Sequence, residues 1–108
     1  MDNLAVFNFA PVYRAKISQS ASGDVVAAQP GKSIRVLQYL IRAAGAVDVN
    51  FEDGTTDISG VASLPANGGE ASGFCPVGIF ETPPGNALKL TLGSSVQVSG
   101  WLVYQIVG

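Results

Sequence analysis

The sequence contains no histidine and only one cysteine, Cys75. Without histidine, a serine or cysteine nucleophile has no imidazole base, which excludes the common forms of nucleophilic hydrolysis. A single cysteine forms no internal disulfide, so the fold does not depend on an oxidising compartment. We interpret Cys75 as a small buried apolar side chain, because free cysteine is among the most buried residue types.

Charge is also scarce. Charged residues make up 13% of the chain, and the six Lys and Arg residues against eight Asp and Glu residues leave a net charge of −2. An average soluble domain has about 25% charged residues. The cations form no cluster, which argues against binding to nucleic acid or to a membrane surface. Such an exterior consists of small polar residues or is covered by partner proteins.

Long hydrophobic runs are missing as well. Arg14, Arg35, Arg42 and Gln105 interrupt the apolar stretches, and none approaches the roughly 20 residues of a membrane-spanning helix. The start of the chain, Met1-Asp2-Asn3, has an acidic residue where a signal peptide carries cations. We therefore expect the protein to be made in, and to remain in, a cytoplasm.

The chain is rich in turn residues and in alternating apolar residues. Its 108 residues fit one domain, and 13 glycines and six prolines cut it into short apolar runs. Apolar and polar residues alternate in several runs, as in strands with one buried face. The strands expected are Val12–Gln19, Val25–Gln29, Ser33–Ala44, Ala46–Glu52, Ser72–Phe80, Ala87–Leu92 and Ser95–Val107. About seven or eight short strands predict an all-β sandwich or barrel.

Two of these segments break the alternation. In Ser33–Ala44 the apolar positions change parity, which predicts a β-bulge near Val36-Leu37 or a strand buried on both faces; a helix is the second-ranked alternative. In the last segment Gly100 predicts a bulge or bend. Trp101 follows it, and we expect this tryptophan to lie in the core more readily than to form a sugar-stacking platform.

The N-terminal segment, residues 1–11, differs from the domain expected for residues 12–108. Its apolar residues are flanked by Asn3 and Asn8 and end at Pro11. The segment is either a first strand of the sandwich or an arm that lies on a neighbouring subunit. An apolar terminus without a partner would promote aggregation.

No motif carries chemistry. Gly31-Lys32-Ser33 resembles the end of a phosphate-binding loop, but Val26 stands where that loop needs glycine. The acidic stretch from Asp48 lacks the glycine and glutamate of a helical calcium loop, since Asp53 and Ser59 occupy those positions. We therefore predict no catalytic, cofactor-binding or metal-binding residue, and no cofactor.

The order of the strands and turns resembles a family of small tailed-phage structural proteins, the head cement or decoration proteins. The resemblance is carried by Ala28–Val36, Ala46–Phe51, Leu64–Gly69, Pro76–Thr82, Gly85–Leu88 and Val98–Tyr104. It implies a jelly-roll-like antiparallel β-sandwich that is not an enzyme. It also implies a place on the capsid surface of a virion after synthesis in the host cytoplasm, with the major capsid protein and further copies of the chain, often as a trimer, as partners.

Composition and expected exposure suggest where such a protein would contact its neighbours. The candidate interface residues are Leu4, Val6, Phe7, Phe9, Asn67, Phe74, Phe80, Pro83 and Pro84. Similar domains also occur in phage tails and fibres. The alternative function is therefore a tail, fibre, receptor-binding or carbohydrate-binding module that uses exposed aromatic residues.

Overall fold

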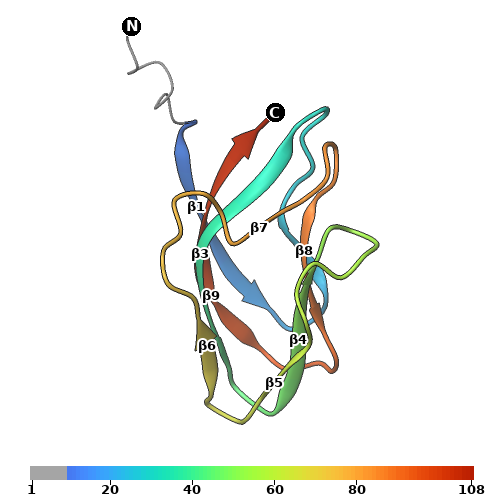
Figure 1. Cartoon of the computed structure of the whole chain (residues 1–108). Helices are drawn as coiled ribbons and strands as arrows, with labels where there is room; N and C mark the ends of the chain where they lie inside the picture. The colour runs from blue at the N-terminus through green and yellow to red at the C-terminus, as the bar shows by residue number, and fades with distance from the viewer. Residues whose placement is uncertain (1–9) are drawn as a thin grey trace, which may run out of the picture.

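The structure is a computed structural model that describes residues 10–108, and these residues form two antiparallel sheets packed face to face (Figure 1). Sheet A has the order β1 (Val12–Gln19), β9 (Val98–Val107), β3 (Ser33–Ala43) and β6 (Gly69–Ala71), with β7 (Phe80–Glu81) also paired to β3. Sheet B has the order β2 (Gly23–Val26), β8 (Leu88–Leu92), β4 (Val47–Glu52) and β5 (Ala62–Leu64). The predicted all-β sandwich is confirmed. The choice between an arm and a first strand for residues 1–11 concerns a segment that lies almost wholly outside the described residues.

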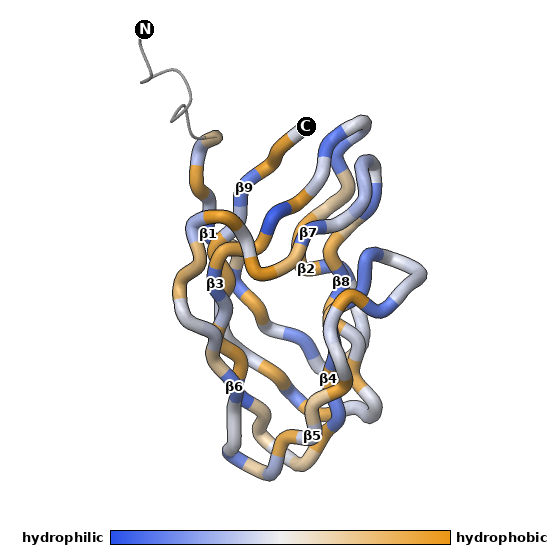
Figure 2. The backbone as a smooth tube through the Cα atoms, in the orientation of Figure 1, coloured by the Kyte–Doolittle hydropathy of each residue, from blue (hydrophilic) through white to orange (hydrophobic). Residues whose placement is uncertain are grey.

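The core lies between the sheets and is built from alternate residues of each strand. Ile17, Ile41 and Leu102 come from sheet A, and Val49 and Leu90 come from sheet B. The hydropathy of the chain accordingly alternates along its strands (Figure 2). Burying one such side chain contributes roughly 1.5–3 kcal/mol, so the alternating pattern fixes which face of each strand turns inward.

The change of parity in β3 is a β-bulge, as predicted. The pairing of β3 with β9 shifts register between Val36 and Gln38. Ile34 and Val36 face the core before the shift, and Ile41 and Ala43 face it afterwards. The extra residue, Leu37, is buried outside the main core cluster. The alternative of a helix is wrong.

Gly100 does not mark a bulge, because the pairing of β9 with both neighbours passes through it without a shift. A Cβ atom at this position would lie 1.9 Å from the carbonyl oxygen of Leu40 and 3.0 Å from the Cα of Ile41. Glycine is therefore required here because the backbones of β9 and β3 approach closely.

The strand predicted over Ser72–Phe80 is wrong, and the short strands β5 and β6 were not predicted. Residues 72–79 run along the edge of β3 as an irregular loop between β6 and β7. The loop is still attached to β3, because Cys75 donates its amide hydrogen bond to Leu37 O (2.9 Å) and Ile79 donates to Val36 O (2.7 Å). These bonds lie at the bulge of β3, where a regular ladder is interrupted.

Candidate functional site

The outer face of sheet A presents a tryptophan to the surface. The register places Lys16, Trp101 and Leu40 in one row across β1, β9 and β3. The neighbouring rows are Arg14, Val103 and Gln38, and Ser18, Ser99 and Arg42. We call the set Arg14, Lys16, Gln38, Leu40, Arg42, Trp101 and Val103 the Trp101 face.

Trp101 is half-buried and does not belong to the core, so its predicted core position is wrong. The core side of β9 is taken by Leu102, which is fully buried. Strand side chains alternate between the two faces, so Trp101 must point to the outside. Leu40, across the pair from Trp101, is an exposed large hydrophobic residue.

The Trp101 face is cationic at its margins. Arg14, Lys16 and Arg42 are exposed on it. A fourth cation of sheet A, Arg35, is paired with Glu81 through Nε and Oε1 at 2.9 Å. Aromatic and arginine side chains around an apolar centre are enriched at protein interfaces, where they supply much of the binding energy.

A groove of about 780 Å³ lies at the end of the same face. Its lining includes Pro11, Arg35, Val77 and Gln105. The Gln105 side chain is buried, and its Nε2 donates a hydrogen bond to the carbonyl oxygen of Ala10 at 2.9 Å. The groove combines apolar and hydrogen-bonding groups, which suits it to a side chain or a short segment of a protein partner.

The loop beside this groove carries exposed apolar side chains. Val77 is 79% exposed and Phe74 is 59% exposed. Cys75 is half-buried, not fully buried as predicted, and its Sγ lies 3.5 Å from the carbonyl oxygen of Gly78. The loop therefore adds apolar area beside the Trp101 face while its backbone is fixed to β3.

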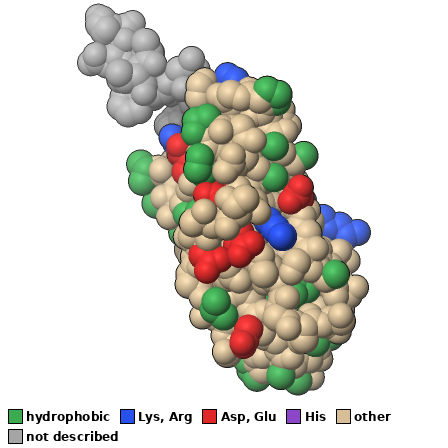
Figure 3. Space-filling view, turned by 90° about the vertical axis from the view of Figure 1, so that its right-hand side faces the viewer, with side chains coloured by type: hydrophobic (Ala, Val, Ile, Leu, Met, Phe, Trp, Pro, Cys, Tyr) green, Lys and Arg blue, Asp and Glu red, His purple; other side chains and the backbone are tan. Residues whose placement is uncertain are grey.

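The outer face of sheet B is acidic. Asp24 of β2 and Glu52 of β4 lie on either side of Lys89 of β8 in the register. Asp48 lies on the same strand as Glu52, and Asp57 follows that strand and forms a β-bridge with Glu52. We call the set Asp24, Asp48, Glu52 and Asp57 the acidic face. Figure 3 views the molecule from this side and shows several acidic side chains with a basic side chain beside them.

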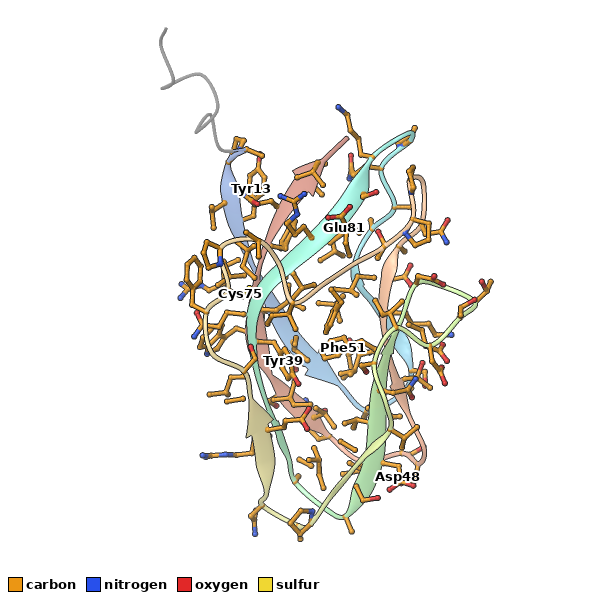
Figure 4. The ribbon with its side chains drawn as sticks, viewed as in Figure 1. Tyr13, Tyr39, Asp48, Phe51, Cys75 and Glu81 are labelled. Atoms are coloured by element: carbon orange, nitrogen blue, oxygen red, sulfur yellow. The ribbon has the colours of Figure 1, made fainter. Side chains whose placement is uncertain are left out.

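Hydrogen bonds organise the acidic face. The neighbouring Thr91 and Asp57 side chains hold the pKa of Glu52 below its ordinary value, whereas the neighbouring Glu52 raises the pKa of Asp57. Asn50 donates to Asp57 Oδ1 at 2.8 Å, and Ser63 donates to Asp48 Oδ1 at 2.7 Å. In Figure 4, Asp48 lies at the outside of the sandwich, away from Tyr39 and Phe51 between the sheets. Its charge is therefore available to a partner.

Asp53, in the calcium-like stretch, has a structural role. It is buried, and its Oδ1 accepts hydrogen bonds from the backbone amides of Thr56 (2.9 Å) and Thr55 (3.3 Å). Asp53 therefore stabilises the turn after β4. Within residues 10–108, no group of three or more His, Cys, Asp or Glu side chains is placed to hold a metal ion.

The candidate interface residues from the sequence do not form one site. The Asn67 amide donates a hydrogen bond to the carbonyl oxygen of Ala43, at the end of β3. Pro83 and Pro84 precede Gly85, whose amide donates to the carbonyl oxygen of Lys32, just before the start of β3. Phe80 packs against the core, so it offers little to a surface. Leu4, Val6, Phe7 and Phe9 lie outside the described residues.

Sequence reasoning missed the Trp101 face. The parity of Trp101 against Leu102 was visible, but which parity faces outward depends on the pairing with β1 and β3. The pairing of Lys16, Trp101 and Leu40 joins residues from three distant segments, and nothing local in the sequence signals it.

No protein-family model matches the chain, and no curated protein matches its sequence. In the described part of the chain, no helix is both long and apolar enough to cross a membrane.

Proposed function

We propose that this chain is a non-enzymatic structural protein of a tailed phage, a cement or decoration protein that binds the major capsid protein lattice on the virion surface. The observation that carries the proposal is the Trp101 face. It offers an aromatic residue, apolar neighbours and cations on a sheet that is part of the core, and hence on a rigid support. That composition is typical of a protein-binding surface. The phage assignment comes from the resemblance of the strand and turn order.

A small rigid sandwich suits the bracing of a capsid. A brace is added in many copies, and each copy contributes a modest contact that symmetry multiplies. Self-association into a trimer would let each copy bind the lattice through several linked contacts. The exposed loop with Phe74 and Val77 adds apolar area to the same side of the molecule.

The experiment is a binding assay on phage heads that lack this chain, with the purified protein added back. We expect the wild-type protein to attach at hundreds of copies per head and Trp101→Ala to attach at least about tenfold more weakly, because hot-spot truncations cost 2 kcal/mol or more. Gln29→Ala, which truncates an exposed residue outside the Trp101 face and outside the acidic face, is the control. Equal attachment of Trp101→Ala and wild type would contradict the proposal.

The surface position of Trp101 also supports a second candidate, a tail or fibre module that binds carbohydrate. A tryptophan ring that is open to solvent on one side can stack on a sugar, and Trp101 is only half-buried. This candidate predicts a handful of copies per particle and glycan-array binding that Trp101→Ala abolishes. Quantitative mass spectrometry of purified virions separates it from the cement function by copy number.

A further inference from the structure

The two outer faces of the sandwich carry opposite charge. Arg14, Lys16 and Arg42 lie exposed on sheet A, where Glu81 is already paired with Arg35. The acidic face on sheet B has four carboxylates, and Lys89 is the cation that lies among them. Glu70, the other acidic residue of sheet A, accepts a hydrogen bond from the Tyr39 hydroxyl. Sheet A therefore carries an excess of cations and sheet B an excess of carboxylates, although the whole chain has a net charge of only −2.

We infer that copies of this chain also bind one another, with the acidic face of one copy docked head to tail on the Trp101 face of the next. The inference deepens the proposed function, because it rests on the self-association expected there and names the two surfaces that meet. Contact between two different surfaces is heterologous, so each copy offers one of each kind to its neighbours. Because the two faces lie on opposite sides of the sandwich, repeated contacts of this kind form an open row of copies, and the copy at one end keeps its Trp101 face free for the capsid lattice.

The spacing of the charges agrees with this pairing. Lys16 and Arg42 are two strands and two residues apart in the register, which corresponds to about 12 Å between Cα atoms. Asp48 and Glu52 are four residues apart on β4, which corresponds to about 13 Å. Two cations on one copy can therefore meet two carboxylates on the next copy at the same time.

The apolar parts of the two faces also correspond. Trp101, Leu40 and Val103 lie at the centre of the basic face, and Val61, which precedes β5, is exposed beside the acidic one. An apolar centre with a charged rim is the usual composition of a protein interface. Nucleic acid fits the molecule less well, because three cations give few phosphate contacts and the acidic face would repel the polymer.

The experiment is sedimentation velocity of the full chain over a range of concentrations at low and high salt, with charge-reversed variants. One variant carries Lys16→Glu and Arg42→Glu, and the other carries Asp48→Lys and Glu52→Lys. We expect wild type to associate, and each variant alone to associate at least about tenfold more weakly, since like charges then face each other. An equimolar mixture of the two variants should associate again, because each offers the face that complements the other.

Lys32→Glu, a charge reversal at the other end of β3, is the control and should associate like wild type. If a reversed variant is unfolded by circular dichroism, the neutral pair Lys16→Gln with Arg42→Gln and the pair Asp48→Asn with Glu52→Gln replace it, each with weaker association expected. A chain that stays monomeric at every concentration overturns the inference, whether or not it binds added DNA. So does association that survives both reversals.

Attachment to phage heads separates this inference from the proposed function. Copies that associate through these faces but do not attach to heads would leave the inference standing and overturn the cement function. A protein that stays monomeric but attaches to heads would overturn the inference and leave the cement function standing.

Discussion

The hydroxyl of Tyr39 in β3 donates a hydrogen bond to Glu70 Oε1 in β6 at 2.7 Å. The Tyr39 ring meanwhile packs edge-on against Phe51 of β4, with ring centroids 5.1 Å apart. One side chain thus ties the short strand β6 to its sheet and joins that sheet to the opposite one. Burial and the bond to Glu70 raise the pKa of Tyr39 above its ordinary value.

Replacing Tyr39 by phenylalanine keeps the ring and removes the bond to Glu70. We expect the free energy of unfolding at neutral pH to fall by about 1 kcal/mol, because the bond is only partly shielded from water. The raised pKa means that the folded state holds the phenolic proton more tightly, so this contribution is complete below about pH 10 and is lost as the pH rises further.

Urea denaturation at about pH 8 and about pH 11 tests the Tyr39 prediction. Wild type should lose more stability between the two values than Tyr39→Phe. Tyr13→Phe, which removes a phenol from the exposed end of β1, is measured beside it as a second Tyr→Phe variant. An identical response in all three proteins would show that the Tyr39 proton is not linked to folding.

A methyl group at position 100 should separate β9 from β3. The added Cβ of Gly100→Ala would lie 1.9 Å from Leu40 O, and a backbone atom cannot yield as a flexible side chain does. We expect a loss of about 3 kcal/mol or more, or no folded protein at all. Gly60→Ala is the control, because nothing lies within 4 Å of its added Cβ, and it should change stability by less than about 1 kcal/mol. Comparable thermal melting of the two variants would contradict the close approach of the backbones.

The sequence predicts those elements whose side chains alternate against the core. Val12–Gln19 agrees in both bounds with β1, and the parity change at Val36-Leu37 marks the bulge in β3. Residues 72–79 are apolar enough to suggest a strand, yet their backbone bonds are dictated by the bulge on the partner strand. The apolar pattern of one segment indicates which side chains are buried. It does not indicate whether the strand beside it is interrupted by a bulge, and for this reason the strand was predicted wrongly.

The candidate site was harder to predict than the fold for a related reason. Trp101 and Leu102 are both apolar, and only the packing of sheet A on sheet B decides that Leu102 enters the core. The segregation of charge likewise depends on the pleat of strands that are far apart in the chain. The sequence contains all the charges, but the pairing of strands assigns each one to a side.

Substitution of Thr82 tests whether the start of β3 depends on a hydrogen-bond acceptor in a side chain. Its Oγ1, on a residue that is 2% exposed, accepts a hydrogen bond from the Ile34 amide at 2.9 Å. Thr82→Val keeps the shape but leaves that buried amide without its acceptor, at a cost of about 1–3 kcal/mol. Amide hydrogen exchange should show faster exchange at Ile34 in Thr82→Val but not in Thr82→Ser, which keeps the hydroxyl. Unchanged protection of Ile34 in the valine variant would mean that another acceptor replaces Thr82.

Asn67 was predicted as an interface residue, and its backbone gives it a conformational role that can be separated from binding. Its φ of 62° lies in the left-handed region, which glycine adopts freely and alanine adopts at a cost of about 1 kcal/mol. We therefore expect Asn67→Gly to keep or slightly raise the melting temperature. Asn67→Ala should lower it by a few degrees, since about 1 kcal/mol corresponds to roughly 4–8 °C in a domain of this size.

Ala66→Gly, at the preceding exposed position, is the matched control for Asn67. It has no positive φ, so glycine there only increases the freedom of the unfolded chain and should lower stability by about 0.4–1 kcal/mol. Substitution by glycine is thus expected to keep or slightly raise the stability at position 67 and to lower it at position 66. Equal losses at both positions in differential scanning calorimetry would show that the left-handed conformation of Asn67 carries no strain. If Asn67→Gly melts like wild type but attaches to phage heads more weakly, the Asn67 side chain belongs to an interface as well as to the turn.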